Sequence, residues 1–331
     1  MARILLTQAI LPRAQALLAQ SAELIVATDT RAETLRRAAQ GCDVIVVRAP
    51  LPDDIFVAAP TLVGAVRHGA GVDMIPIDAA TARGVLVANV PGVNAASVSE
   101  HVIGQMIRLA RRGGPVAARL ARGDDRTWPE ARAIAEPGVE LSGRTVGLVG
   151  HGHVGRAIAR ICTQGFGMTA LAFTRSGASG AAAEVRQVSL ADLLLHSDFV
   201  VLACPLTEQT RGLIGAPQFA AMRRGAFLIN VARGPVVDEA AMLAALRSGH
   251  LAGAALDVFG VQPLPPGHAF WSMEHVLVSP HVAGLSEDSM WRMGQGAAQA
   301  VSDLLAGRVP PHCINPEAEP AFRARFGNPS A

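Results

Sequence analysis

The sequence predicts an α/β protein made of two domains with doubly wound parallel sheets. Short runs rich in Val, Ile and Leu alternate along the chain with longer segments of helical periodicity, which is typical of repeated βαβ units. These runs are continuously apolar, which indicates strands covered on both faces. The 331 residues exceed the roughly 100 to 200 residues of one domain, and half are hydrophobic, so two buried cores are expected.

The first series of βα units starts at the N-terminus. Residues 3–7 and 43–47 are predicted as strands, and residues 12–20 between them as a helix. The pattern then restarts more strongly. The strands predicted in this second series are residues 145–149, 169–174, 198–204, 226–231, 252–258 and 275–279. Among the intervening helices, residues 238–243 begin with two acidic residues, as is typical of a first helical turn.

Two long helical stretches flank the second series and predict a discontinuous domain. Residues 94–112 precede the series and residues 287–305 follow it, so both are candidates to connect it with the first series. We therefore expect one domain at residues 97–281. The other domain is expected to combine residues 1–96 with residues 282–331.

The composition excludes several kinds of partner and chemistry. All 29 basic residues are Arg, which excludes a Schiff-base lysine and the lysine of a phosphate-binding P-loop. The net charge is only +2 and no stretch approaches the roughly 18 apolar residues of a membrane span, so neither nucleic acid nor a membrane is an expected partner. The four cysteines lack Cys-x-x-Cys spacing, so we expect no metal site and four buried free thiols in a reducing cytoplasm.

A glycine-rich loop directly follows the first strand of the second series. Residues 147–155 read Gly-Leu-Val-Gly-His-Gly-His-Val-Gly, in front of an apolar-periodic helix. In G-x-G-x-x-G loops the glycines permit a tight turn, close approach of a pyrophosphate, and close packing of helix on strand. The residues expected to contact the cofactor here are Gly150, Gly152, His153, Val154 and Gly155. The loop predicts dinucleotide binding by a Rossmann-type domain; a glycine-rich turn without a ligand is the alternative.

The end of the next strand indicates which dinucleotide is bound. NAD sites usually have an acidic residue about 20 residues beyond the motif, where it holds the ribose hydroxyls. This chain instead has Thr174, Arg175 and Ser176. A guanidinium binds a 2′-phosphate through two hydrogen bonds, so NADP is the expected cofactor and NAD the second choice. An ordinary surface arginine is the other interpretation of Arg175.

Motifs spread along nearly the whole chain occur in an order typical of one enzyme family. They are Gly69-Ala70-Gly71-Val72-Asp73, Asn89-Val90-Pro91-Gly92-Val93-Asn94, Ser97-Val98-Ser99-Glu100-His101, the glycine loop, Cys204-Pro205-Leu206-Thr207, Asn230-Val231-Ala232-Arg233-Gly234 and Ser279-Pro280-His281-Val282-Ala283-Gly284. The chain thereby resembles the D-isomer-specific 2-hydroxyacid dehydrogenases, in particular the glyoxylate/hydroxypyruvate reductases. The resemblance implies an NAD(P)-dependent enzyme that interconverts a small 2-oxo acid and its D-2-hydroxy acid. It also implies a Rossmann-type cofactor domain and a flavodoxin-like substrate domain around a cleft.

Arg233 and His281 are the predicted catalytic residues. A hydride that reaches the carbonyl of a 2-oxo acid builds negative charge on oxygen, so the site needs a fixed cation and a proton donor. Both residues closely follow an apolar strand, at the end where ligands of α/β proteins bind. A guanidinium can hold both a carboxylate and a carbonyl, and histidine exchanges protons near neutral pH. The residues alone leave an ion-pair arginine and a structural histidine open; the resemblance assigns the catalytic roles.

Gln262 departs from the family pattern, which usually has a glutamate here. A carboxylate beside an imidazolium raises the pKa of the ring, by about 1 to 3 in comparable pairs. Glutamine can orient the ring but supplies no such charge. If His281 is the acid, 2-oxo acid reduction is expected to favour mildly acidic conditions.

Two other functions stay open. Formate dehydrogenases of the same superfamily resemble this chain in pairing Gln262 with His281, because formate oxidation needs no proton transfer to a substrate oxygen. Asn94 also aligns with an asparagine of their formate site. The second alternative is a catalytically decayed NAD(P)-binding sensor, although Arg233 and His281 are both present.

The resemblance implies further contacts with ligands and with a second subunit. The additional cofactor-binding residues are Cys204, Pro205, Thr210, Val231, Ala232, Asp257, His281 and Gly284. The substrate-binding residues are Ala49, Leu51, Gly69, Ala70, Gly71 and Arg233. Trp128 lies within residues 123–138, where family members extend an arm across a dimer contact, so a homodimer is expected.

Overall fold

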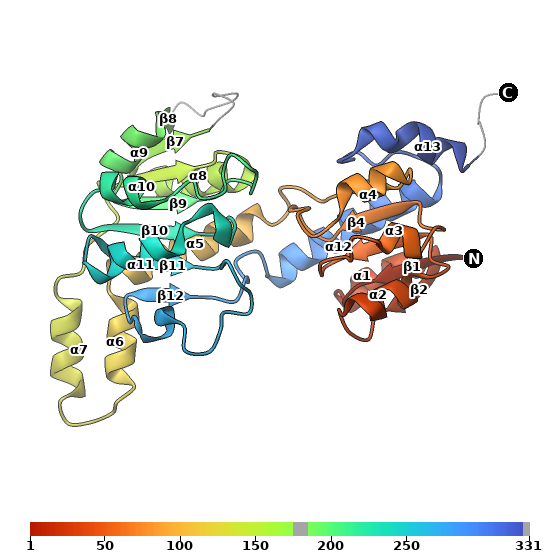
Figure 1. Cartoon of the computed structure of the whole chain (residues 1–331). Helices are drawn as coiled ribbons and strands as arrows, with labels where there is room; N and C mark the ends of the chain where they lie inside the picture. Colours follow the sequence, from red (N-terminus) through yellow and green to blue (C-terminus); the bar gives the residue numbers. More distant parts are fainter. Residues whose placement is uncertain (175–184, 327–331) are drawn as a thin grey trace. The chain divides into compact units, whose positions relative to one another are not determined.

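A computed structural model describes residues 1–174 and 185–326, and these residues form two compact α/β units (Figure 1). Unit 1 comprises Met1–Asn94 and Ser286–Ala331, and unit 2 comprises Ala95–Leu285. Each unit contains one parallel sheet with helices packed on it, which confirms the predicted fold class. Among the described residues, no helix combines the length and the apolar character needed to cross a bilayer.

Unit 1 has a five-stranded sheet in the order β2-β1-β3-β4-β5. Its strands are β1 (Ala2–Leu6), β2 (Ala22–Val26), β3 (Val44–Val47), β4 (Gly64–Arg67) and β5 (Leu86–Ala88). Its helices are α1 (Pro12–Leu18), α2 (Ala32–Ala39), α3 (Ile55–Ala58), α4 (Ile77–Ala82), α12 (Glu287–Leu305), the 3₁₀ turn Pro316–Ala318 and α13 (Glu319–Ala324). The chain runs from β1 to β2 on one side and then returns to β3 on the other side of β1, with both neighbours parallel to β1, which is the doubly wound arrangement.

The two faces of this sheet form separate cores because successive side chains of a strand point to opposite faces. In β3, Val44 and Val46 pack with α1 and α12 on one face. Ile45 and Val47 pack with α2 and α3 on the other. All four side chains are buried, which explains why the strand is continuously apolar.

Unit 2 has a seven-stranded sheet in the order β12-β11-β10-β9-β6-β7-β8. Its strands are β6 (Thr145–Val149), β7 (Thr169–Phe173), β8 (Val185–Gln187), β9 (Phe199–Leu202), β10 (Ala226–Asn230), β11 (Leu251–Leu256) and β12 (Val276–Val278). Its helices are α5 (Ala95–Ala110), α6 (Gly113–Leu120), α7 (Thr127–Ala135), α8 (His153–Phe166), α9 (Leu190–His196), α10 (Ala216–Ala221), α11 (Glu239–Arg247) and the 3₁₀ turns Gly234–Val236 and Ala269–Ser272. The chain continues to one side of β6 through β7 and β8 and then crosses to the other side through β9. Ligands of such sheets bind where this reversal occurs, at the carboxyl ends of β6 and β9.

Helices α6 and α7 form a hairpin that projects from the sheet of unit 2 (Figure 1). Arg119 on α6 links the two helices of the hairpin. Its side chain is 6% exposed and forms ion pairs with Asp124, between the helices, and with Glu130 on α7. Trp128 on α7 is 76% exposed. The inner side of the hairpin is therefore polar and ionic, while a large aromatic ring stays outside.

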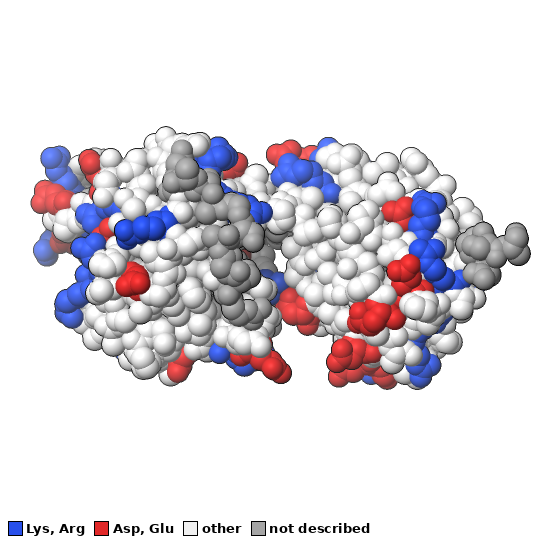
Figure 2. Space-filling model, turned by 90° about the horizontal axis from the view of Figure 1, so that it is seen from above, with Lys and Arg blue, Asp and Glu red and all other residues white. Residues whose placement is uncertain are grey.

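Charged side chains are mixed over both units. Figure 2 shows acidic and basic residues beside one another on the visible face of each unit, so neither sign forms a continuous field there. The charge that acts on a ligand must then come from individual side chains. All four cysteines are free thiols, but only Cys42 and Cys162 are buried; Cys204 and Cys313 are half-buried, which corrects the expectation for these two.

Candidate active site

The glycine loop turns sharply between β6 and α8. Gly150 has a φ of +100°, a conformation that favours glycine, and a Cβ atom there would lie 2.7 Å from the carbonyl oxygen of Ala203. A Cβ atom on Gly155 would lie 2.2 Å from the carbonyl oxygen of Gly150. Helix α8 can approach the turn this closely only because residue 155 has no side chain. These two glycines shape the loop itself.

Gly152 has a different environment, because a Cβ atom there would meet nothing within 4 Å. It is the N-cap of α8, and within the described residues no side chain caps the helix. The first amides of a helix have no acceptor inside it, so the loop offers an open backbone surface and N–H donors to an anion. The geometry fits a pyrophosphate held by Gly152, His153 and Val154.

The carboxyl end of β7 holds a hydroxyl group with unused hydrogen-bonding capacity. Thr174 Oγ1 is buried and has no partner among residues 1–174 and 185–326. A buried hydroxyl is normally paired, so this atom fits a position that a ligand such as a ribose completes. Arg175 and Ser176, the other residues predicted for this corner, lie outside the described residues.

The segment after β9 is held by Thr210. Its Oγ1 donates to the carbonyl oxygen of Pro205 at 2.7 Å and accepts from the amide of Thr207 at 2.7 Å. Burial raises the pKa of the neighbouring Cys204 thiol, so it stays uncharged. Thr210 thus fixes a turn next to the glycine loop, since Gly150 contacts Ala203 and Cys204.

Arg233 follows β10 at the carboxyl edge of the same sheet. Asn230, the last residue of β10, donates to the carbonyl oxygen of Arg233 at 3.2 Å and accepts from the amide of Ala232 at 3.0 Å. The guanidinium of Arg233 donates to the carbonyl oxygen of Ala232 at 2.7 Å. Asn230 is therefore a further functional candidate. The sequence alone assigned it no role, although it is the first residue of the motif that contains Arg233.

Gly234, the residue after Arg233, packs closely against the main chain of Phe259, in the segment that leads to Gln262. A Cβ atom on Gly234 would lie 2.0 Å from the carbonyl carbon of Phe259. Glycine at this position therefore allows the Arg233 turn and the 259–262 segment to touch. The structure brings these two predicted parts of the site together within unit 2.

His281 lies in the loop after β12 and has a φ of +57°, which is unusual for a residue with a side chain. Its amide donates to the main-chain oxygen of Asp257 at 2.9 Å. The Asp257 carboxylate, on a residue only 3% exposed, accepts from the amides of Val282 and Ala283 at 2.9 Å each. Asp257, predicted as a cofactor neighbour, thus also fixes the loop that carries His281 and continues to Gly284.

Gln262 contacts the ring of His281. Its Oε1 lies 3.2 Å from Nδ1 of His281, and its Nε2 donates to the carbonyl oxygen of Phe259 at 3.4 Å. Because an amide oxygen only accepts, this contact requires the proton on Nδ1. In the neutral ring, Nε2 is then the nitrogen that carries no proton.

The predicted substrate residues of unit 1 lie at the carboxyl edge of its sheet. In the loop Gly69–Ala70–Gly71, all three carbonyl oxygens accept hydrogen bonds, from the Val90 amide, the Asn89 side chain and the Arg67 guanidinium. The Gly69 amide donates to the carbonyl oxygen of Arg67 at 2.9 Å, so the amides of Ala70 and Gly71 are the groups of this loop that suit a carboxylate. Ala49 and Leu51 follow β3 and are 5% and 7% exposed, Leu51 as part of the core of unit 1.

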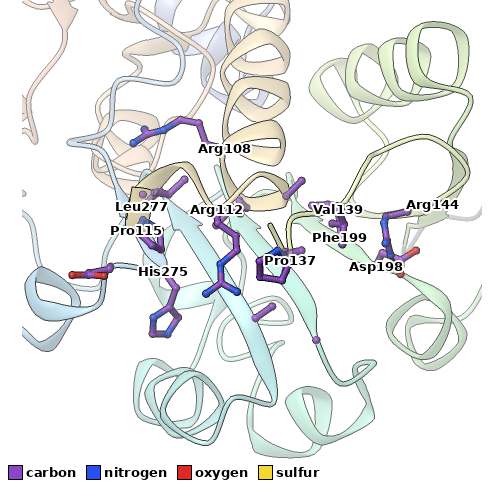
Figure 3. Close-up of a pocket in the computed structure, with 17 residues that line it drawn as sticks. Arg108, Arg112, Pro115, Pro137, Val139, Arg144, Asp198, Phe199, His275 and Leu277 are labelled. Carbon is purple, nitrogen blue, oxygen red and sulfur yellow. Dashed lines mark hydrogen bonds and ion pairs between the residues drawn. The ribbon is translucent and has the colours of Figure 1, made fainter. Parts of the chain in front are cut away.

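A pocket of about 310 Å³ lies at the opposite, amino edge of the sheet of unit 2. Figure 3 shows Arg112 between His275 and Pro137 there, and Arg144 beside Asp198. None of the residues predicted for catalysis or binding lines it. A smaller pocket of about 140 Å³ is lined by Asn230, Gly234 and Phe259, next to Arg233. The volume of a pocket therefore does not identify the candidate active site. The candidate site is defined by the residues at the carboxyl edge of the sheet.

Comparisons with known proteins agree with the fold described above. Residues 103–283 match the family model for the NAD binding domain of D-isomer specific 2-hydroxyacid dehydrogenases. The chain is 36% identical over 281 residues to a glyoxylate reductase of Korarchaeum cryptofilum, covering 83% of each protein. Among solved structures it is similar to D-mandelate dehydrogenase of Rhodotorula graminis, with a TM-score of 0.85, 26% identity, and 95% of this chain and 97% of that chain covered. It is also similar to an NADPH-dependent glyoxylate/hydroxypyruvate reductase of Sinorhizobium meliloti, with a TM-score of 0.80, 28% identity, and coverage of 96% and 99%.

Proposed function

The chain belongs to the D-isomer specific 2-hydroxyacid dehydrogenase family and is a nicotinamide-dependent oxidoreductase, and we propose that it reduces a small 2-oxo acid to the D-2-hydroxy acid, with Arg233 and His281 as its catalytic residues. The observation that carries the proposal is the position of these two residues. They follow β10 and β12 at the carboxyl edge of the sheet whose β6 leads into the glycine loop.

The residues present divide the chemistry between them. The nicotinamide supplies a hydride when NAD(P)H is bound at the glycine loop. Arg233 holds the substrate carboxylate and stabilises the negative charge that develops on the carbonyl oxygen as its carbon accepts the hydride. His281 Nε2 then gives a proton to that oxygen, and in the opposite direction it takes the proton from the hydroxyl group.

Gln262 keeps this proton donor in the required tautomer. Its oxygen accepts from Nδ1, and its own amide is oriented by the carbonyl oxygen of Phe259. The imidazole therefore presents Nε2 to substrate. Unlike a glutamate, Gln262 adds no negative charge that would stabilise the imidazolium.

NADP is the proposed cofactor. The support is the sequence Thr174-Arg175-Ser176, which lacks a carboxylate, and the unpaired buried hydroxyl of Thr174 within the described part of the chain. The similar protein of Sinorhizobium meliloti is named as NADPH-dependent. Comparing kcat/KM for NADPH and NADH tests this point, and a clear preference for NADH would contradict it.

The direct test of the reaction uses purified protein with NADPH and either glyoxylate or hydroxypyruvate, the substrates named for similar reductases. We expect loss of NADPH absorbance with both substrates, formation of glycolate from glyoxylate, and formation of the D-hydroxy acid from hydroxypyruvate, whose product is chiral. Arg233→Ala should lower kcat/KM by about a hundredfold to a thousandfold, the scale for removal of an oxyanion-stabilising donor. Binding of NADPH without turnover across a panel of 2-oxo acids would instead indicate a sensor.

Formate oxidation is the second candidate, and the Gln262–His281 contact favours it. Hydride transfer from formate to the cofactor yields carbon dioxide and involves no proton transfer to a substrate oxygen. Incubation with formate and NADP therefore distinguishes the two reactions. We also propose that the active form is a homodimer in the cytoplasm, with Trp128 at the contact between subunits.

A further inference from the structure

A chain of polar side chains in unit 2 leads from helix α5 to the loop of His281, and the proposed mechanism does not use it. His101 Nε2 on α5 lies 3.4 Å from Ser279 Oγ, although 178 residues separate the two in the sequence. Ser279 Oγ in turn donates to Asp257 Oδ1 at 2.6 Å. The chain therefore ends on the carboxylate that holds the amides of Val282 and Ala283.

The number of available protons fixes the direction of these hydrogen bonds. Ser279 has one hydroxyl proton, and the 2.6 Å contact with a carboxylate uses it. Ser279 Oγ can then only accept from His101, so the proton of the neutral ring is on Nε2. Burial lowers the pKa of His101, which agrees with a neutral ring. The Gln105 amide, also 3.4 Å from this nitrogen, must then turn its oxygen toward it, and this orientation gives up the 3.5 Å hydrogen bond that Arg108 donates to Gln105 Oε1.

The carboxylate at the end of the chain holds an uncommon backbone conformation. His281 has a φ of +57°, a region that side chains with a Cβ rarely adopt. Such a conformation persists only where surrounding contacts determine it. Here the contacts are the three hydrogen bonds to the Asp257 carboxylate, two from the amides that follow His281 and one from Ser279.

We propose that His101 is a positioning residue for His281: by donating to Ser279, it orients the hydroxyl group that, with Asp257, holds the loop from Ser279 to Ala283 in the conformation that presents the His281 ring. The inference rests on the proposed role of His281 as acid and base. His101 contacts neither substrate nor cofactor in this account, and it acts only through the loop.

The first test is kinetic and uses a double-mutant cycle. His101→Leu removes the donor and should lower kcat for 2-oxo acid reduction about fivefold, which is about 1 kcal/mol. The Kd for NADPH should stay within about twofold, which is a change of about 0.4 kcal/mol or less. His101→Gln, which keeps a donor of similar length, should restore most of kcat. In a Ser279→Ala background, His101→Leu should have little further effect, because the two residues act in one chain.

The second test does not depend on catalysis. Hydrogen exchange at the amides of Val282 and Ala283 reports whether their bonds to Asp257 persist. Both His101→Leu and Ser279→Ala should accelerate exchange there and leave exchange in β6 unchanged. His250→Leu is the control, because His250 lies in the same unit and its ring contacts the carbonyl oxygen of Met222 at 3.0 Å, away from the Asp257 carboxylate.

Independent effects of the two substitutions on kcat, or unchanged exchange at residues 282 and 283, would overturn the inference. If His101→Leu does not fold, His101→Ala, which also removes the donor, supplies the same cycle with Ser279→Ala. A wild-type protein without 2-oxo acid reductase activity would refute the proposed function instead, and the exchange experiment would still decide whether the chain holds the loop.

Discussion

The side chain beside His281 influences up to which pH the proposed proton donor stays charged. Gln262→Glu places a carboxylate where Oε1 now lies, 3.2 Å from Nδ1. The carboxylate stabilises the imidazolium, so the pKa of His281 should rise, and reductase activity should extend upward by about one pH unit or more. The measurement is kcat/KM for glyoxylate reduction as a function of pH.

Gln262→Asn is the control for this substitution. It keeps an amide but shortens the side chain, so it should lower kcat without moving the profile to higher pH. A Gln262→Glu profile identical to that of the wild type would show that His281 is not the group whose ionisation limits the rate.

A second histidine links stability to pH in unit 1. His68 is 3% exposed, and neither ring nitrogen has a partner among the described residues. Burial, followed by the nearby charges of Arg48 and Arg67, lowers its pKa to about 4. The unfolded chain, with a pKa of about 6.5, therefore takes up a proton between these values that the folded chain does not.

The free energy of unfolding therefore falls as the pH drops through the pKa of His68 in the unfolded chain. It stops falling below the pKa of His68 in the folded chain. Between pH of about 7.5 and 5 the loss from His68 should be roughly 2 kcal/mol. His68→Leu should remove it and flatten the pH dependence. Urea unfolding of both proteins at the two pH values measures the difference; equal losses would mean that His68 is protonated in the folded state.

At the scale of the elements, substitutions at the junction of β6 and α8 can distinguish an effect on folding stability from an effect on cofactor affinity. Gly152→Ala adds a methyl group into open space, so the unliganded protein should keep its Tm. The same methyl group faces the proposed pyrophosphate, so the Kd for NADPH should rise about tenfold, or about 1.4 kcal/mol. NADPH fluorescence titration and thermal unfolding supply the two readouts.

Gly155→Ala is the matched substitution in the same loop. Its Cβ atom would lie 2.2 Å from the carbonyl oxygen of Gly150, so helix and turn must move apart. This should cost roughly 1 to 3 kcal/mol of stability and lower the Tm even without cofactor. If Gly152→Ala lowered the Tm as much, the space beside Gly152 would be filled in the folded protein.

Most strands could be predicted from sequence because they are continuously apolar, and these include the edge strand β12, but the short strands β4 and β5 and the edge strands β2 and β8 could not. β8 has the sequence Val-Arg-Gln, and only its first residue is buried. β2 likewise has a single buried residue and pairs only with β1. An edge strand needs one neighbour and one covered face, so its sequence carries little of the signal that reveals β3 or β6.

The same limit applies to the site. Arg233 and His281 could be predicted because each follows a recognisable strand and has a chemistry that the reaction requires. Asn230, Ser279 and His101 could not be given roles, because their partners depend on backbone conformation or on contacts distant in sequence. A serine or an asparagine is common, and only its neighbours in the fold distinguish a positioning role.

At the scale of the whole molecule, the hairpin of α6 and α7 supports the proposed homodimer. Its inner side is filled by the ion pairs of Arg119 with Asp124 and Glu130. Two of its large apolar residues are exposed, Leu120 at 41% and Trp128 at 76%, whereas Val116 and Ile134 are half-buried. Exposed aromatic residues on a projecting element are typical of protein contacts, and a second copy of this chain is the partner that the family resemblance implies.

Trp128→Glu should therefore shift the protein from dimer to monomer, because a carboxylate at the centre of an apolar contact is left without a partner. Light scattering after size-exclusion chromatography measures the mass directly. Trp271→Glu is the control: this tryptophan of the same unit is 57% exposed, and its indole nitrogen donates to the carbonyl oxygen of Pro265 at 3.0 Å. A dimer that survives Trp128→Glu, or an equal loss of dimer in both variants, would place the subunit contact away from α7. Retention of 2-oxo acid reductase activity in a monomeric Trp128→Glu protein would further mean that Arg233 and His281 need no second subunit.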